Sequence, residues 1–188
     1  MLPEQAKKKL LGGEYAETLG RLHVCAGDGA ARQAERIAGA VDEFERRYGK
    51  DRDIAVFSAP GRTEVGGNHT DHQGGHVLAA GVDLDAVAVA ARAEGGKIRV
   101  ASAGFGEDAA EAGDYAPRPE EKGRSAALVR GLGKGFADRG YRVGGFCAYT
   151  TSDVLPGSGL SSSAAFEVLL GTAFNSLFCA GALPPLAV

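Results

Sequence analysis

The chain has 188 residues, of which 44% are hydrophobic and 24% are charged, and its formal net charge is −3. A chain of this length forms about one to one and a half domains. The small negative charge excludes the strong basic field by which many proteins attract nucleic acid. The 29 glycines are numerous and fall in clusters, as tight turns and close contacts between backbone and ligand require.

Residues 1–50 are predicted to form an N-terminal helical segment. Apolar residues recur there at helical spacing with Arg and Glu between them, as in Ile37, Ala40, Val41 and Phe44. Gly49 follows them as a plausible helix C-cap. His23 lies in this segment and is expected to be structural. The remaining residues, 51–188, are predicted to form the main domain.

Strands are expected at 54–58, 77–80, 82–91 and 97–101, with a polar loop at 59–76. Asp83, Asp85 and Arg92 stand among Val and Ala in and just after the third of these strands, which indicates that one face of the sheet is wet.

The C-terminal half is predicted to be a loop at 104–124, a helix at 125–138 and a strand at 141–151. A loop at 157–163 and a long helix at 164–180 follow. Because strands and helices alternate irregularly, the predicted fold class is α+β with a mixed sheet and packed helices.

Residues 168–188 carry no charged side chain, which raises the question of a membrane span. Polar residues and the pair Pro184-Pro185 interrupt the stretch, so a helix buried in a protein core is the better interpretation, and no membrane partner is expected. Such a helix needs something to pack against, so we expect the chain to be part of a longer protein. Three cysteines without a CxxC spacing indicate a reduced, cytoplasmic protein.

Two segments carry the chemistry. The first runs from Ala59 to His72 and packs Arg, Asn, His and Asp among glycines. Loops on a rigid scaffold are common places for binding residues, and these donors and acceptors suit a small ligand rich in hydroxyls. A surface ion pair between Arg62 and Glu64 is the alternative for that arginine. A metal site formed by His69, His72 and His76 is disfavoured, since their spacing suits zinc only on a helix.

The second segment, Val154 to Ala165, places two glycines and three serines where a helix is expected to begin. A helix N-terminus offers unpaired N–H groups and partial positive charge, which favour a phosphate, and a serine hydroxyl can bind magnesium. A simple Ser-capped helix start is the alternative. Neither a Walker A pattern nor a GxGxxG pattern is present, so a nucleotide loop here is of another type.

Together the two motifs resemble the galactokinase branch of the GHMP kinases. Residues 61–78 resemble the family's first signature, roughly GRxNxIGEHTDYxxGxVLP, and residues 156–165 match the second, PxGxGLSSSAA, throughout. The resemblance spans most of the chain after residue 54. It implies a GHMP kinase N-terminal domain, of the ribosomal protein S5 domain 2-like fold, without its C-terminal domain.

The resemblance also implies roles for individual residues. Arg62 would stabilise charge in the transition state, and Ser163 would bind Mg²⁺. The sugar would be bound by Asn68, His69, Thr70 and Asp71. ATP would be bound by Ser102, Gly157, Ser158, Gly159, Leu160, Ser161, Ser162 and Ser163. The family's catalytic Asp and second metal-binding Glu would lie beyond residue 188, so the chain alone is expected to turn over poorly.

The implied reaction is transfer of the ATP γ-phosphate to the anomeric hydroxyl of galactose. Asn68 stands where the family usually has Glu, and its amide can bond a hydroxyl but carries no charge. A kinase for an N-acetylhexosamine or arabinose is therefore a second hypothesis. A galactose sensor that binds a transcriptional regulator is a third; the intact run Ser161–Ala165 favours catalysis over it.

Overall fold

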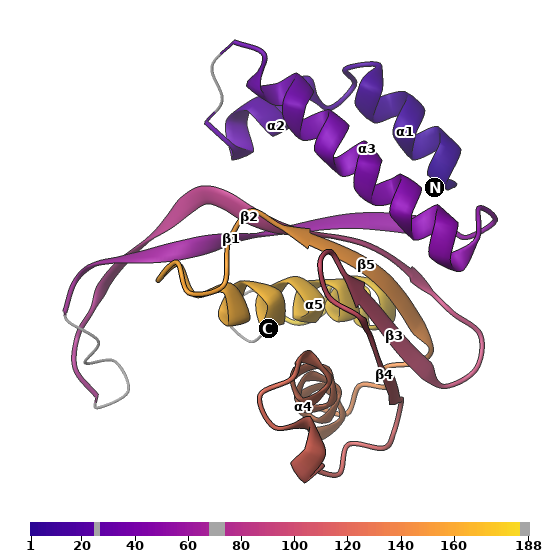
Figure 1. Cartoon of the computed structure of the whole chain (residues 1–188). Helices are drawn as coiled ribbons and strands as arrows, with labels where there is room; N and C mark the ends of the chain where they lie inside the picture. Colours follow the sequence, from indigo (N-terminus) through magenta and orange to yellow (C-terminus); the bar gives the residue numbers. More distant parts are fainter. Residues whose placement is uncertain (25–26, 68–73, 185–188) are drawn as a thin grey trace.

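In the computed structural model, which describes residues 1–24, 27–67 and 74–184, a five-stranded sheet lies between two helical layers (Figure 1). The strand order is β1-β2-β5-β3-β4; β3 and β5 are parallel and the other neighbours antiparallel. The helices are α1 (Pro3–Leu11), α2 (Ala16–Leu22), α3 (Gly29–Tyr48), the 3-10 helix η2 (Pro119–Glu121), α4 (Ser125–Asp138) and α5 (Ser162–Cys179). The strands are β1 (Ile54–Gly66), β2 (Leu78–Arg92), β3 (Lys97–Ser102), β4 (Glu107–Glu111) and β5 (Phe146–Ser152). The predicted mixed α and β architecture is confirmed.

The layer formed by α1, α2 and α3 covers one face of the sheet (Figure 1). The buried side of α3 carries Val41 and Phe44, which join Val87 and Val89 of β2 in one hydrophobic cluster. The apolar spacing of the N-terminal segment therefore does predict the face that is buried. Gly49 ends α3 with φ +92°, a conformation that glycine adopts at low cost.

The second layer is formed by α5, which lies against the other face of the sheet, and by α4 beyond it (Figure 1). Phe174 of α5 meets Phe146 of β5 edge to face, with ring centroids 5.0 Å apart. Helix α5 contains most of the uncharged stretch that begins at Val168, and it is a core helix, as expected. Among the described residues, the structure contains no helix with the length and hydropathy of a membrane span.

Two loop predictions are corrected by the structure. The predicted loop at 59–76 is wrong over its first part, because β1 continues to Gly66 and pairs along its length with β2. The predicted loop at 104–124 contains the short strand β4 and the helix η2. Polar residues at the end of β1 and in β4 concealed these strands, since hydrophobic periodicity was the main signal available.

The expectation of a wet face on β2 is also wrong at one position. Asp85 is only 3% exposed, and it lies under α3 rather than toward solvent. His23, predicted to be structural, is buried at the end of α2 with Nδ1 3.2 Å from the carbonyl oxygen of Asp83. These two residues fill the region where the helical layer meets the sheet.

Candidate functional site

The first motif begins on β1, next to an irregularity in its pairing with β2. The register shifts between Pro60 and Arg62, so Gly61 stands at a bulge-like position. Such irregularities bend a strand and re-aim the side chain that follows. Arg62 is that side chain. It is 40% exposed, and its Nη1 lies 4.0 Å from Oε2 of Glu64.

The ion pair proposed as the alternative for Arg62 is thus present as a long contact. At this distance the guanidinium keeps much of its surface open, while the Glu64 side chain is only 12% exposed. An ion pair at the 4.0 Å limit, with a half-exposed arginine, contributes little to stability. Arg62 therefore retains the freedom to meet an anionic ligand.

The predicted sugar-binding residues Asn68, His69, Thr70 and Asp71 lie outside the described residues. The structure does describe both strands that flank them. Gly66 at the end of β1 pairs with Leu78 at the start of β2. The first motif thus begins on β1 and ends at the start of β2, the two paired antiparallel strands.

The second motif follows β5 and leads into α5. Residues 155–159 are exposed, and Gly157 and Gly159 have φ of +77° and +76°. These are left-handed conformations that a side chain would strain. Two glycines therefore let the loop turn tightly while its backbone stays accessible to a ligand.

The start of α5 departs from an ordinary serine cap. Ser161 is the N-cap residue, but its backbone is left-handed with φ +60° and its side chain makes no capping hydrogen bond. The first N–H groups of a helix have no intrahelical partner, so this end remains able to bind an anion. Ser163, the second residue of α5, is exposed. The Ser-capped helix start considered as the alternative is thus not formed through the Ser161 side chain.

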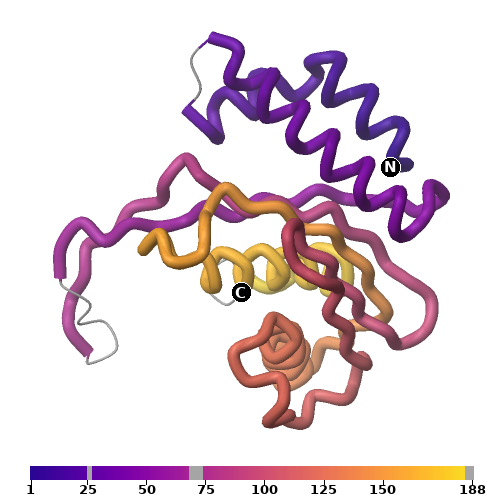
Figure 2. The backbone as a smooth tube through the Cα atoms, viewed as in Figure 1, coloured from indigo at the N-terminus to yellow at the C-terminus, as the bar shows by residue number. Residues whose placement is uncertain are grey.

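The two motifs meet directly. The backbone N–H of Arg62 donates to the carbonyl oxygen of Leu160 at 3.0 Å. Next to it, a Cβ at Gly61 would lie 3.0 Å from Cγ2 of Val154 and 3.1 Å from the Leu160 oxygen. Figure 2 shows the segment after β5 returning beside the β1–β2 ribbon. Arg62 and the loop 155–159 therefore lie next to each other.

Ser102 lies at the same edge of the sheet. It ends β3, and because β3 runs parallel to β5, both strands end on the side from which the second motif continues. Thr150 of β5 donates its hydroxyl to Ser102 Oγ at 2.8 Å. The structure thus places Ser102 beside β5, the strand that leads into the second motif.

Gly61 is a site residue to which sequence reasoning assigned no role. Its tight contact with Val154 excludes any larger side chain unless the loop shifts. The available signal was a glycine inside what proved to be a strand, since such glycines often mark a close backbone approach.

Magnesium suits the residues present. Mg²⁺ prefers oxygen ligands and is often held by one or two protein groups together with substrate phosphates. The exposed Ser163 hydroxyl, at a helix start that could bind an anion, fits that pattern. Among the residues that the structure describes, no cluster of three or more His, Cys, Asp or Glu side chains forms a separate metal centre.

Comparison with known proteins gives two family matches, one for each motif. Residues 42–92 match the galactokinase galactose-binding signature, and residues 125–186 match the GHMP kinases N terminal domain. Galactokinase from Streptomyces coelicolor is 35% identical over 150 residues, which cover 78% of this chain and 38% of that protein. Galactokinase from Lacticaseibacillus casei is 32% identical over 142 residues, covering 75% and 36%.

Solved structures agree with these matches. Lactococcus lactis galactokinase complexed with galactose superposes with a TM-score of 0.74 at 26% identity, covering 81% of this chain and 39% of that one. Methanococcus jannaschii mevalonate kinase, at 14% identity and a TM-score of 0.56, shares the fold. The chain spans less than two fifths of the length of these galactokinases. It belongs to the GHMP kinase family, within which it matches the N-terminal portion of galactokinases.

Proposed function

We propose that this chain forms the sugar- and ATP-binding portion of a kinase that transfers the γ-phosphate of ATP to the anomeric hydroxyl of galactose. The observation that carries the proposal is the hydrogen bond from Arg62 N–H to the Leu160 carbonyl oxygen. It joins a galactose-binding signature to a phosphate loop, so that a sugar hydroxyl and the ATP phosphates can meet at Arg62.

The proposed chemistry is positioning and charge stabilisation. Phosphoryl transfer needs little covalent participation from the protein, and charge develops mainly on the transferred phosphoryl oxygens. The half-open guanidinium of Arg62 supplies fixed positive charge there, and the start of α5 supplies N–H donors. The backbone of Arg62 and the start of α5 are both held by the fold before the ligand arrives, which limits the reorganisation that binding requires.

Magnesium would be held by the Ser163 hydroxyl together with the ATP phosphates, and when bound it would neutralise phosphate charge. The loop Gly157–Ser163 would surround the phosphates through its backbone. Ser102, beside Thr150 at the sheet edge, would contact the adenosine side. Asn68, His69, Thr70 and Asp71 would bind the sugar hydroxyls.

The acceptor sugar remains part of the proposal. Galactose is favoured because the matched signature and the galactokinase relatives concern that sugar. Because Asn68 stands where the family usually has Glu, an N-acetylhexosamine or arabinose is the alternative acceptor. Calorimetric titration of the chain with a panel of sugars tests this: tighter binding of galactose than of the other sugars supports the proposal, and a clear preference for another sugar overturns it.

We further propose that the 188-residue chain binds its ligands but turns over poorly by itself, because it spans only 38% of its Streptomyces relative. Calorimetric titration with MgATP and galactose, beside an activity assay on the same preparation, tests this. Binding with little turnover is expected. Turnover at the rate of a complete galactokinase would contradict it, and galactose binding without any MgATP binding would favour the sensor function.

A further inference from the structure

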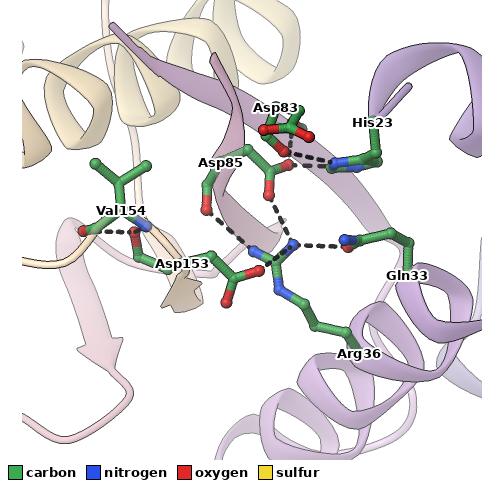
Figure 3. A network of polar contacts seen from close by, with 9 residues as sticks. His23, Gln33, Arg36, Asp83, Asp85, Asp153 and Val154 are labelled. Carbon is green, nitrogen blue, oxygen red and sulfur yellow. Dashed lines mark hydrogen bonds and ion pairs between the residues drawn. The ribbon is translucent and has the colours of Figure 1, made fainter. Parts of the chain in front are cut away.

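A buried acid stands on β2 behind the candidate site. Asp85 is 3% exposed and faces α3, where Nη1 of Arg36 lies 2.7 Å from its Oδ1 (Figure 3). Nη2 of Arg36 donates to the Asp85 carbonyl oxygen at 3.1 Å, and Ser58 donates its hydroxyl to Oδ2. A buried carboxylate requires such partners because its desolvation is costly.

Arg36 reaches the phosphate loop through a second carboxylate. Its Nη1 lies 3.2 Å from Oδ2 of Asp153, the residue that precedes Val154 (Figure 3). The Asp153 backbone N–H donates to the Asp85 carbonyl oxygen at 2.9 Å. The entrance of the loop is therefore tied to β2 by its backbone and to α3 by its side chain.

Further contacts connect the loop entrance to Arg62, the candidate catalytic residue. Val154 is buried and packs against Gly61, which directly precedes Arg62. Leu160, at the far end of the exposed stretch, accepts the Arg62 N–H. The loop 155–159 is thus held at both ends, and an ion pair between Arg36 and Asp153 joins α3 to the loop entrance.

The side chain of Arg36 is well suited to hold the loop entrance at Asp153 in one orientation. Its side chain is 17% exposed and its planar guanidinium engages two carboxylates and a carbonyl at once. A fork of this kind is more specific in direction than the single ammonium of a lysine. Arg36 also precedes both ranges matched by the family models, so this link is supplied from outside them.

We propose that Arg36 is a positioning residue that sets the phosphate loop for ATP, acting through Asp153. The inference rests on the proposed function, because it assigns Arg36 to the ATP half of that site. Arg36 would touch neither substrate; it would act by holding the loop entrance against Gly61 while the sugar-binding segment is left unchanged.

A double-mutant cycle on the full chain separates this role from a general contribution to stability. Arg36→Met, Asp153→Asn and the double variant are titrated with MgATP and with galactose, and each is melted. We expect Arg36→Met to weaken MgATP binding about tenfold and Asp153→Asn a few-fold, as coupled residues do. The double variant should bind MgATP no more weakly than Arg36→Met, and galactose binding should stay within about twofold. Arg36→Lys should restore part of the loss.

Lys7→Met is the matched control. Nζ of Lys7 lies 2.7 Å from Asp42 and 2.9 Å from Glu45, so it too joins α3 to a neighbour through two carboxylates, but away from the loop. This variant should melt at a lower temperature and bind MgATP like the wild type.

The outcomes are distinguishable. If the wild-type chain does not bind MgATP, the ATP-binding part of the proposed function is wrong. If the wild type binds MgATP and Arg36→Met binds it equally well, or if the two single effects add in the double variant, the role of Arg36 is overturned. Should Arg36→Met fail to fold, Asp153→Asn, at a half-exposed side chain, carries the test alone: unchanged MgATP binding overturns the inference and selective weakening supports it.

Discussion

The backbone N–H of Arg62 donates to the carbonyl oxygen of Leu160 at 3.0 Å, and this bond joins two motifs that lie about a hundred residues apart. Strand β1 carries one partner, and the loop between β5 and α5 carries the other. Under the proposed function, Arg62 must keep a fixed position relative to the loop, since small displacements cost much of the benefit of proximity. The bond supplies that fixed relationship.

Gly61→Ala should disturb this junction. The new Cβ would lie 3.0 Å from Val154 Cγ2 and 3.1 Å from the Leu160 oxygen, so the loop must shift. We expect about 1–3 kcal/mol of destabilisation and roughly tenfold weaker MgATP binding. Gly81→Ala is the control, because Gly81 pairs with Arg62 across the sheet and its Cβ would only approach Pro60 at 4.0 Å. Equal MgATP affinity in both variants would argue against the junction.

Ser163→Ala should weaken ATP binding only when magnesium is present. The hydroxyl is exposed at the start of α5 and is the proposed protein ligand of the metal. Loss of one such contact should cost about tenfold in affinity for MgATP. Titrations with ATP in excess Mg²⁺ and in EDTA measure the difference, with Ser163→Thr as the conservative control. A loss of the same size in EDTA would show that Ser163 contacts the nucleotide directly instead.

Arg62→Met should reduce phosphoryl transfer far more than ligand binding. Its guanidinium is proposed to stabilise charge that develops in the transition state, and removing one such donor typically costs about 10²–10³ in kcat. Stability should change little, since the side chain is 40% exposed and its contact with Glu64 is long. Steady-state kinetics of an active preparation, with wild type and variant compared, provide the measurement. A raised KM for ATP with unchanged kcat would assign Arg62 to ground-state binding.

Acid should destabilise the fold partly through Glu121. Arg130 forms two hydrogen bonds with this carboxylate, at 2.7 and 2.9 Å, and they lower the pKa of Glu121 below its ordinary value of 4.5. A lowered pKa in the folded state contributes stability above the unfolded pKa, and this stability is lost as pH falls through the folded pKa.

Glu121→Gln should therefore lose less stability than the wild type between pH 7 and pH 3. Denaturant unfolding at several pH values measures the free energy of unfolding of each protein. Glu120→Gln, at an exposed neighbouring carboxylate, is the control and should follow the wild type. Parallel pH curves for the wild type and Glu121→Gln would contradict the assignment.

The sequence predicts the helices of this chain better than its strands. The helix at 125–138 is reproduced with the same bounds, and α3 buries the apolar side that its spacing indicates. The missed part of β1 carries Arg62 and Glu64, and β4 reads Glu-Asp-Ala-Ala-Glu, so neither shows the alternation of a strand. Their conformation depends on pairing with β2 and β3, which local sequence does not encode.

The candidate site, too, could be predicted from the sequence only in part. Two linear motifs predict a phosphate loop and a role for Arg62, because glycines and serines at fixed spacing can place a backbone close to phosphate. Contacts between distant segments could not be predicted. Asp85 looked like a solvent-facing residue of β2, and only the packing of α3 over the sheet shows it buried against Arg36. The sugar-binding residues Asn68, His69, Thr70 and Asp71 remain predictions, because they lie outside the described residues.

Calorimetric titration of one preparation of the chain with MgATP, with galactose, and with each in the presence of the other tests the central claim most directly. A joint site at the Arg62–Leu160 junction predicts that both ligands bind, and that Gly61→Ala weakens MgATP while Gly81→Ala does not. The account would be contradicted if the chain bound neither ligand. It would also be contradicted if Gly61→Ala left the affinity for MgATP unchanged.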